Sequence, residues 1–469
     1  MLKKCFVACI MCLWFSSYGL DAAVPPTAIV NSQGEEVFNG KCGDSGLWPK
    51  EDEGDHFPCT REWWNIDTFF GDGHNTWSVT ASMGYEMETF TCNMFFTLFN
   101  GETGQCYRFG SFDDPLGTLL HKKNEVNLTY GLSTMRGLYP RYCIHLEDKE
   151  SILSLDMDFY AETKPQWVTG NITDGFLPMG MGFYRYGFIS RCSVTGTMYF
   201  EEKTVNITGK GYYEHVWGNW SYHDPLMTPR NVSELYGTLI KWWWNSNSFS
   251  LPSSIALSSE NNPFGYDWIW ATFENNWSLF YGNLMFWIME GPALGILYLE
   301  KDGHYNEFVD ISFKYEAREY NKEFDIYYPL EIIIEAKNND TLLSLHFTMT
   351  AERNVYIDRF NGITYWQGLG LWEAPGIVTG YYNNGGANVS LQGKCEIEPQ
   401  RLFSPLGHNQ ITITRYPETR GISINITSHL LATEVYMGFH LLPRPRFYYD
   451  IKHIERDREN NKSLPIKKR

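Results

Sequence analysis

The feature of this sequence that most restricts its fold is an alternation of apolar and polar residues with a period of two. In residues 343–350 four apolar side chains alternate with Ser, His and Thr, and residues 77–85, 411–414 and 422–427 alternate in the same way. Successive side chains of a β-strand point to opposite faces of a sheet, so these segments are predicted to be half-buried strands. We find no long segment with a clean 3.6-residue apolar period. The chain is therefore predicted to be all-β.

Short turn signals separate these predicted strands. Asp-Gly, Asn-Gly and Gly-Gly pairs favour tight hairpins, because their residues tolerate the positive φ angles that such turns require. Many short strands joined by hairpins are typical of sandwiches and up-and-down barrels, and 469 residues are too many for one barrel. Two β-domains are therefore expected. The turn pairs are Asp72–Gly73, Asn100–Gly101, Asp302–Gly303, Asn361–Gly362 and Gly385–Gly386.

The domain boundaries follow from shifts in composition. The polar segment 223–234 is the best candidate for a boundary, and we expect a first barrel over 40–228, a second over 235–445 and a charged tail over 446–469. A run of three tryptophans follows the boundary at 242–244. Strand alternation would point Trp243 outward if its two neighbours point inward, and the run could belong to an interface or to the rim of a pocket.

The first 22 residues have the pattern of a secretory signal peptide. Lys3 and Lys4 precede an apolar stretch, Cys5 to Phe15, that is too short to span a bilayer. We therefore expect the mature protein to be secreted and glycosylated, because the chain carries ten Asn-x-Ser/Thr sequons. The predicted glycosylation sites are Asn127, Asn171, Asn206, Asn231, Asn339, Asn388 and Asn425.

Removal of the signal peptide would leave seven cysteines. In an oxidising compartment this number predicts three disulfides and one free thiol. Cys42 with Cys59 and Cys92 with Cys106 are the plausible local pairs, and the sequence leaves the other pairings open.

Charge and missing motifs argue against several classes of function. A net charge of −17 disfavours binding to nucleic acid or to anionic membranes. No apolar run of about 18 residues follows the N-terminus, so no membrane span is expected. The mature chain has no phosphate-binding Gly-Lys loop, no His-Glu-x-x-His and no paired Cys-x-x-Cys. Neither a built-in metal site nor another cofactor is expected.

Three aromatic segments carry the most information about function. They are Glu-Trp-Trp-Asn at 62–65, Gly-Lys-Gly-Tyr-Tyr-Glu-His-Val-Trp-Gly at 209–218 and Tyr-Asp-Trp-Ile-Trp at 266–270. We interpret them as strands that present aromatic walls with a few ionisable groups embedded in them.

The order of these motifs resembles the AttH/CrtC-like lipocalin family. Glu-Trp-Trp at 62–64 precedes Ser-x-x-Gly-x-x-x-Phe at 193–200 and then Gly-x-Gly-Tyr-x-Glu-His-x-Trp-Gly at 209–218, while residues 389–396 resemble the closing strand of the family's second half. The resemblance covers roughly residues 45–400. It implies two consecutive lipocalin-like antiparallel β-barrels packed together.

The resemblance also implies a class of function. The family includes carotenoid hydratases, kievitone hydratase and fungal cyclases that catalyse Diels–Alder reactions, which hold a bulky apolar substrate in an aromatic-lined cavity without a redox cofactor. Hydratase members carry Tyr-His-Asp-His-Asn-Trp-Gly at the second motif. Here Tyr213 replaces the first His and Val216 replaces the Asn, and these departures bear on hydratase activity more than on the fold.

Glu214 and His215 are the candidate catalytic residues. Burial among aromatic rings would keep the Glu214 carboxyl protonated near neutral pH, so that it could give a proton to an alkene. His215 could position water or relay the proton, and nearby ring faces could stabilise a cation. The candidate substrate-binding residues are Trp64, Tyr213, Trp217, Asp267, Trp268 and Trp270.

Strand geometry leaves these roles open. In a regular strand Glu214 and His215 point to opposite faces, so they share a cavity only if the strand is bulged there. The two residues could instead form a buried pair that braces the junction between the barrels. Trp64 could be ordinary core, and Asp267 could cap a turn.

The sequence therefore predicts a secreted, cofactor-independent enzyme. Its substrate would be a hydrophobic polyene, terpenoid or phenolic compound, changed by acid-assisted hydration, isomerisation or cyclisation. The alternative is a secreted lipocalin-like carrier that binds such a molecule without changing it.

Overall fold

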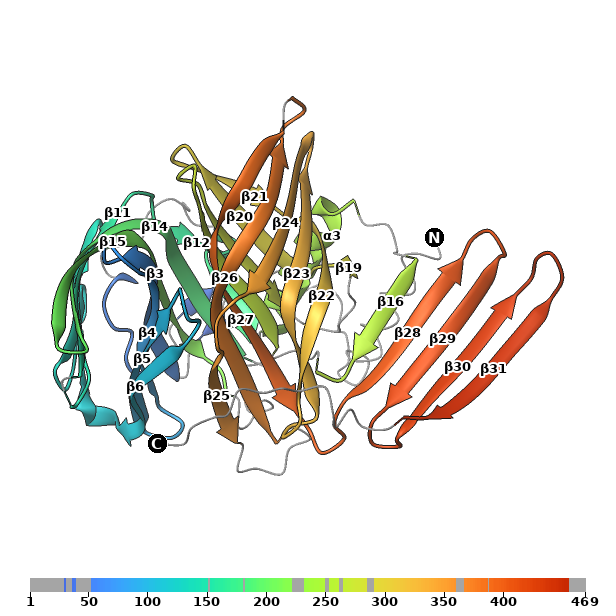
Figure 1. Cartoon of the computed structure of the whole chain (residues 1–469), viewed down its shortest axis with the longest axis horizontal. Coiled ribbons are helices and arrows are strands. Elements are labelled where there is room, and N and C mark those ends of the chain that lie inside the picture. Colours follow the sequence, from blue (N-terminus) through green and yellow to red (C-terminus); the bar gives the residue numbers. More distant parts are fainter. Residues whose placement is uncertain are drawn as a thin grey trace.

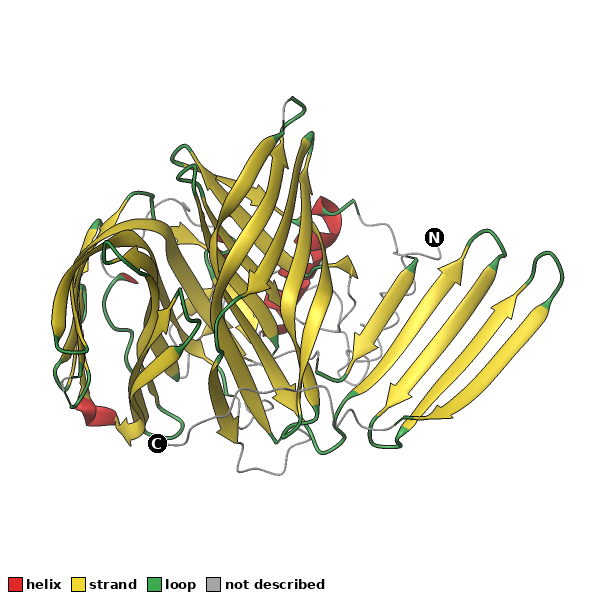
Figure 2. Ribbon diagram, in the orientation of Figure 1, coloured by secondary structure: helices red, strands yellow, loops and turns green. Residues whose placement is uncertain are grey.

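The computed structural model of the chain describes residues 29–30, 36–38, 52–150, 152–179, 182–221, 232–248, 253–260, 265–284, 291–359, 367–386 and 388–454. The expected signal peptide, Cys42, Asn231 and the Asn361–Gly362 turn lie outside these residues. Most of the described chain is antiparallel strand, arranged as two curled sheets and a flatter third sheet (Figures 1 and 2). The predicted architecture of two consecutive lipocalin-like β-barrels is confirmed.

The first curled sheet has thirteen strands, in the order β6-β5-β4-β3-β15-β14-β11-β10-β9-β8-β7, with β12 and β13 also paired to β14. A short 3-10 helix, η2 (Leu116–Thr118), follows β6, and a short helix, α2 (Gly170–Thr173), follows β12. The strands are β3 (Arg61–Gly71), β4 (Thr76–Glu86), β5 (Thr91–Asn100), β6 (Cys106–Pro115), β7 (Leu119–Leu120), β8 (Val126–Tyr130), β9 (Ser133–Leu138), β10 (Arg141–Glu147), β11 (Leu153–Ala161), β12 (Gln166–Trp167), β13 (Phe176–Met179), β14 (Gly182–Phe200) and β15 (Lys203–Asn219).

The second curled sheet has eleven strands, in the order β19-β22-β23-β24-β26-β27-β17-β18-β20-β21, with β25 paired to β26. The strands are β17 (Tyr266–Phe273), β18 (Ser278–Leu284), β19 (Gly291–Pro292), β20 (Gly295–Lys301), β21 (His304–Phe308), β22 (Asp310–Asn321), β23 (Ile326–Asn338), β24 (Thr341–Met349), β25 (Asn354–Arg359), β26 (Gly368–Asn383) and β27 (Val389–Phe403).

A five-stranded sheet, in the order β16-β28-β29-β30-β31, extends from the body of the molecule at the right of Figure 1. Its strands are β16 (Ser254–Ser258), β28 (Asn409–Tyr416), β29 (Gly421–Ser428), β30 (Thr433–His440) and β31 (Arg446–His453); β1 (Ile29–Val30) and β2 (Glu36–Phe38) form a separate pair. The expected second domain, 235–445, thus spans the second curled sheet and part of this extension, and β31 lies in the expected tail. None of the described helices has the length and apolar character needed to cross a membrane.

The four turn pairs that can be checked all lie between paired strands. Asp72–Gly73 joins β3 to β4, Asn100–Gly101 joins β5 to β6, Asp302–Gly303 joins β20 to β21, and Gly385–Gly386 lies between β26 and β27. The alternating segments also form strands, since 77–85 lies in β4 and 343–349 lies in β24. Local alternation and turn chemistry were sufficient to place these hairpins.

Each curled sheet encloses its own apolar core, and a third apolar cluster lies between the two sheets. Strand β15 contributes side chains both to the core of the first sheet and to the cluster between the two sheets. Tyr213 and Trp217 belong to the core of the first sheet, whereas Tyr212 and Val216 belong to the cluster between the sheets. Strands at this junction are therefore buried on both faces, and their side-chain parity decides which space each residue enters.

A helix, α3 (Val232–Ser246), stands where the sequence analysis expected a polar boundary and a strand-like tryptophan run. Strand alternation does not apply to Trp243, because this segment is helical, and Trp243 lines the cavity between the two curled sheets. Trp243 is only 6% exposed, and its indole Nε1–H donates to the carbonyl oxygen of Ala293 at 2.7 Å. The helical period was present in the sequence: the buried residues are Val232, Leu235, Tyr236, Leu239 and Trp243.

The expected disulfide between Cys92 and Cys106 is wrong. Both residues are free thiols, as are the other four described cysteines. In the β5–β6 hairpin Cys106 pairs with Phe99 near the turn, whereas Cys92 pairs with Asp114 at the far end, so the two sulfurs lie at opposite ends of the ladder. Cys59 is also free, and its Sγ contacts the Tyr85 hydroxyl at 3.2 Å.

The predicted glycosylation sites in the described residues lie on strands, turns and the short helix α2. Asn171, Asn206, Asn339 and Asn388 are exposed, and Asn127 and Asn425 are half-buried. Glycosylation itself stays a prediction.

Candidate functional site

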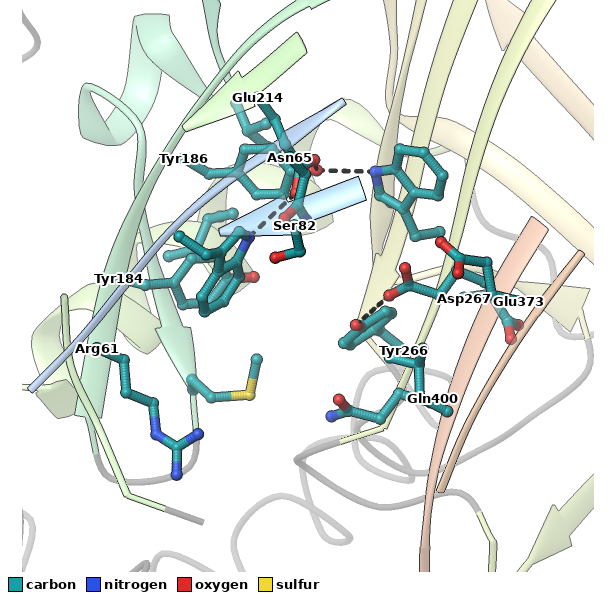
Figure 3. A pocket seen from close by; sticks show the side chains of 18 of the residues that line it. Arg61, Asn65, Ser82, Tyr184, Tyr186, Glu214, Tyr266, Asp267, Glu373 and Gln400 are labelled. Carbon is teal, nitrogen blue, oxygen red and sulfur yellow. Dashed lines mark hydrogen bonds between the residues drawn. The ribbon is translucent and has the colours of Figure 1, made fainter. Parts of the chain in front are cut away.

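A cavity of about 340 Å³ lies between the two curled sheets. Strands β3, β4, β14 and β15 line it from the first sheet, strands β17, β26 and β27 from the second, and α3 contributes several apolar side chains. Figure 3 shows Asn65, Tyr186 and Glu214 on one side and Tyr266, Asp267, Glu373 and Gln400 on the other. The site is thus built jointly by the two barrels.

Glu214 of β15 faces this cavity and is 5% exposed. Four donors converge on its carboxyl group. The Trp63 indole Nε1–H and the Asn65 amide Nδ2–H donate to Oε1 at 3.1 and 2.7 Å, while the hydroxyls of Tyr186 and Tyr212 donate to Oε2, the latter at 2.9 Å. The carboxyl group is therefore held in one orientation.

Two opposing effects set the proton affinity of Glu214. Burial raises its pKa because a charged carboxylate is poorly solvated there, and the four hydrogen bonds lower the pKa by favouring the charged form. Burial is the larger effect, so the pKa lies above the ordinary value for Glu. Across the interface the Trp268 Nε1–H donates to the Tyr186 oxygen at 2.8 Å, which ties the second sheet to this network.

Further carboxyl groups line the same cavity. Asp67 comes from β3, Glu373 from β26 and Glu398 from β27, and the pKa of each is raised, first by burial and then by repulsion from neighbouring acids. Glu373 accepts from Thr80 Oγ1 at 2.9 Å and from Asn354 Nδ2 at 3.0 Å. Glu398 accepts from the hydroxyl of Tyr266.

Asp267 reaches the cavity lining, and its carboxylate is already paired. Oδ1 accepts from Arg401 Nη2 at 2.6 Å, and Oδ2 accepts from the Tyr315 hydroxyl at 2.5 Å. Asp267 and Arg401 are 0% and 1% exposed. This geometry gives Asp267 a structural ion pair within the second sheet, and the predicted contact with substrate stays a prediction.

His215 lies on the opposite face of β15 from Glu214. The strand is regular here, with Glu214 opposite Asn65 and His215 opposite Trp64, and the irregularity in this ladder falls between Ile189 and Cys192. The two candidate catalytic residues therefore do not share the cavity. Strand β15 has no bulge at this position, and only a bulge would have allowed Glu214 and His215 to face the same cavity.

His215 belongs to a buried network inside the first barrel. Its Nε2 lies 2.8 Å from Glu62 Oε1, and the same oxygen lies 2.8 Å from His56 Nδ1. The Tyr85 hydroxyl donates to Glu62 Oε2 at 2.7 Å. The carboxylate is buried, but its hydrogen bonds to both histidines lower its pKa to about 2, and the acids Asp52 and Glu62 raise the pKa of His56 to about 8.

The same three residues have the donor types of a metal site. Among the described residues, one group of potential metal-ligating side chains (His, Cys, Asp or Glu) has ligand atoms that all lie within 4.8 Å of one another. It consists of His56, Glu62 and His215. Both imidazoles already hydrogen-bond to the Glu62 carboxylate, so the hydrogen-bonding needs of this carboxylate are met without a metal ion.

The aromatic candidates divide between three spaces. Trp64, Tyr213 and Trp217 lie inside the first barrel and do not line the cavity: Trp64 stacks on His215, Tyr213 on Tyr142, and Trp217 on His56. Trp268 lines the cavity. Trp270 packs between the sheets, stacked on Phe69, with its Nε1–H donating to the Ser190 carbonyl at 2.8 Å.

Sequence reasoning missed Asp67, Tyr186, Glu373 and Glu398. A signal existed at Glu373, which interrupts a segment of otherwise apolar residues. An acidic residue in a strand that is buried on both faces needs a partner or a function. That these acids meet across a domain interface could not be seen locally.

Comparison with solved structures shows that the chain shares a known fold. A putative AttH from Nitrosomonas europaea is 14% identical and has a TM-score of 0.50, over 76% of this chain and 97% of that one. Kievitone hydratase from Nectria haematococca is 11% identical with a TM-score of 0.48 (81% and 98% covered), and CghA with Sch210972 is 10% identical with a TM-score of 0.42 (78% and 98% covered). The first of these structures confirms the resemblance to AttH/CrtC-like proteins at the level of the fold.

No protein-family model matches the sequence, and no curated protein matches it.

Proposed function

We propose that this protein is a secreted, cofactor-independent enzyme that protonates a bulky hydrophobic substrate in the cavity between the two barrels. The observation that supports this most strongly is Glu214, a buried carboxyl group that faces an aromatic-walled cavity and receives four hydrogen bonds. A passive apolar carrier has no use for such a group.

The four donors explain how Glu214 could act as an acid. Before reaction, burial favours the neutral carboxyl, which holds the proton to be transferred. When the proton moves to an alkene carbon, negative charge develops on the carboxylate, and the same donors stabilise that charge more strongly than they stabilise the neutral acid. The indole side chains of Trp63 and Trp268 line the cavity, and an aromatic ring can stabilise a carbocation.

The outcome depends on what the carbocation meets next. Water that adds to it and returns a proton to Glu214 completes a hydration. Loss of a proton from a neighbouring carbon to the Glu214 carboxylate gives an isomer. Attack by a second double bond closes a ring and moves the positive charge to a new carbon, and loss of a proton from beside that carbon to Glu214 completes the cyclisation. In each case Glu214 is regenerated, so no further group is consumed.

Glu214→Gln tests the proposal. The substrate class is first narrowed by mass spectrometry of small molecules extracted from the purified protein. The amide keeps the size of the side chain but has no acidic proton, so turnover should fall by about 10²- to 10⁴-fold while ligand affinity is retained. The exposed Glu316→Gln on β22 is the matched control and should leave turnover unchanged.

Two outcomes would contradict the proposal. Unchanged conversion by the Gln variant would remove Glu214 from the mechanism. Recovery of the extracted compound intact after long incubation with the wild-type protein would favour the carrier. The pH profile gives an independent check, because an essential protonated acid loses activity as the pH rises through its pKa.

A further inference from the structure

The cavity between the two curled sheets contains more carboxyl groups than the protonation of a neutral substrate requires. Asp67, Glu373 and Glu398 line it together with Glu214. Asp67, Glu214 and Glu373 are buried and Glu398 is half-buried, and the four come from strands of both sheets. A cavity that only enclosed a hydrocarbon would be expected to avoid these groups, because burying a carboxyl without a partner is costly.

The four carboxyl groups differ in how well they are partnered. Glu214 receives four hydrogen bonds, Glu373 receives two and Glu398 receives one. Asp67 is 5% exposed, and within the described part of the chain no donor hydrogen-bonds to its carboxyl group.

A second acceptor without a partner lies beside Asp67. Asn65 is two residues earlier on β3 and faces the same cavity. Its Nδ2–H donates to Glu214, which sets the orientation of the amide, and its buried Oδ1 has no hydrogen-bond partner. The wall formed by β3 therefore presents two adjacent acceptors that lack a donor.

Cations of the protein do not fill this need. Glu214 from β15, Glu373 from β26 and Glu398 from β27 act on Asp67 electrostatically, and all have the same sign. The buried Glu396 of β27 also interacts with Asp67, again as a like charge. Two arginines line the cavity elsewhere: Arg61 forms an ion pair with Glu86, and Arg108 Nε donates to Asn354 Oδ1 at 2.9 Å.

We propose that the ligand of this cavity is an apolar molecule that carries a protonated amine, whose N–H groups bind the Asp67 carboxylate and Asn65 Oδ1. The inference rests on the same cavity as the proposed function and names the substrate class. The aromatic lining supports it, because Trp63 and Trp268 line the cavity and aromatic rings attract cations. An ammonium with N–H donors fits better than a quaternary one, since the two acceptors require donors.

A bare metal ion does not fit this arrangement. Among the described residues, the cavity acids do not form a group whose ligand atoms lie within 4.8 Å of one another; His56, Glu62 and His215 form one, inside the first barrel. A divalent ion needs several oxygens at about 2.0–2.6 Å from one centre. An organic cation can instead interact with acids spread around a wider space.

Isothermal titration calorimetry at pH 7 with three probes of similar size tests the inference. The probes are 2-(1-naphthyl)ethylamine, 2-(1-naphthyl)ethanol and 1-naphthaleneacetate, which are cationic, neutral and anionic. We expect the amine to bind at least about tenfold more tightly than the alcohol, because a charge-assisted hydrogen bond is stronger than a neutral one. Proton release should accompany binding of the amine alone, since a cation favours ionised carboxyl groups.

Asp67→Asn should reduce the preference for the amine to about threefold or less, since it removes a charge-assisted hydrogen bond. Asp340→Asn, at an exposed position, is the matched control and should leave the preference for the amine over the alcohol unchanged. Equal wild-type affinity for the amine and the alcohol, tighter binding of the carboxylate, or displacement of the amine by Mg²⁺ or Ca²⁺ would overturn the inference. If Asp67→Asn does not fold, the affinities of the wild-type protein for the three probes still test the inference. Turnover of a neutral substrate without a preference for the amine would support the enzyme proposal and contradict the proposed ligand class. A preference for the amine without any turnover would support the ligand class and contradict the enzyme proposal.

Discussion

Replacement of Glu62 by Gln should destabilise the first barrel strongly, because this carboxylate holds two histidines in the barrel core. Glu62 is fully buried and accepts hydrogen bonds from the Tyr85 hydroxyl and the His56 backbone N–H, as well as from the two rings. A glutamine has the same shape but carries no charge, and its amide group would place hydrogen atoms against two donors.

The magnitude follows from the pKa of Glu62. Lowering it from the ordinary 4.5 to about 2 corresponds to about 3 kcal/mol of stability at neutral pH. This contribution is present above pH 4.5 and is lost as the pH falls through about 2. The pKa of His56, raised from 6.5 to about 8, reflects the same interaction between His56 and Glu62. The stability contributions of the two pKa shifts are therefore not added.

The histidine adds a pH signature of opposite sign. A raised pKa gives stability that is fully present below pH 6.5 and is lost as the pH rises through about 8. Wild-type stability should therefore decline by about 2 kcal/mol between pH 6.5 and above 8. Glu62→Gln should lose part of this decline, because His56 loses one of the two carboxylate partners that raise its pKa and keeps Asp52.

Urea unfolding of both proteins across pH 5–9 measures these effects. Glu331→Gln on β23 is the control, because Glu331 also pairs with a histidine, His346, at 3.0 Å, but both side chains are about one-third exposed or more. That substitution should change stability by less than about 1 kcal/mol. A loss below about 1 kcal/mol for Glu62→Gln, or a wild-type profile that stays flat from pH 6.5 to 8, would refute the reasoning.

Two further predictions concern a buried ion pair and the thiols. Arg401→Met should destabilise the second barrel by about 3–5 kcal/mol, because it leaves the Asp267 carboxylate buried without a counter-ion, and adding Asp267→Leu should recover part of the loss in a urea melt. Alkylation of the native protein followed by peptide mass spectrometry should label the exposed Cys143 first, and alkylation after unfolding without reductant should also label Cys92 and Cys106. Recovery of a Cys92–Cys106 cross-linked peptide would contradict the hairpin register.

Much of the architecture was accessible from local patterns. Period-two alternation identified strands such as β24, and Gly-containing pairs identified the hairpins at Asp72–Gly73 and Gly385–Gly386. Both signals act between residues that are close in sequence, so one chain suffices to see them. Helix α3 was missed although its apolar residues recur with helical spacing, because its aromatic run was treated as part of a strand.

The site was only half accessible for a different reason. Parity along β15 correctly warned that Glu214 and His215 face opposite sides, and the motif identified Glu214 as a cavity residue. Parity cannot say what lies beyond each face. The partners of Glu214 lie about 28 to 151 positions away in the chain apart from Tyr212, and the acids of β26 and β27 reach the cavity only when the barrels pack.

By itself the sequence determined that this chain makes paired strands, where many of them turn, and that one motif carries an acid in an aromatic setting. Those outcomes depend on backbone sterics and on side-chain spacing over a few residues. Only the tertiary structure decided which space each aromatic residue enters, that Glu62 joins two histidines, and that four carboxyl groups from both sheets surround one cavity. Burial and electrostatic coupling between strands distant in the chain set those outcomes, and both exist only once the two curled sheets have closed against each other.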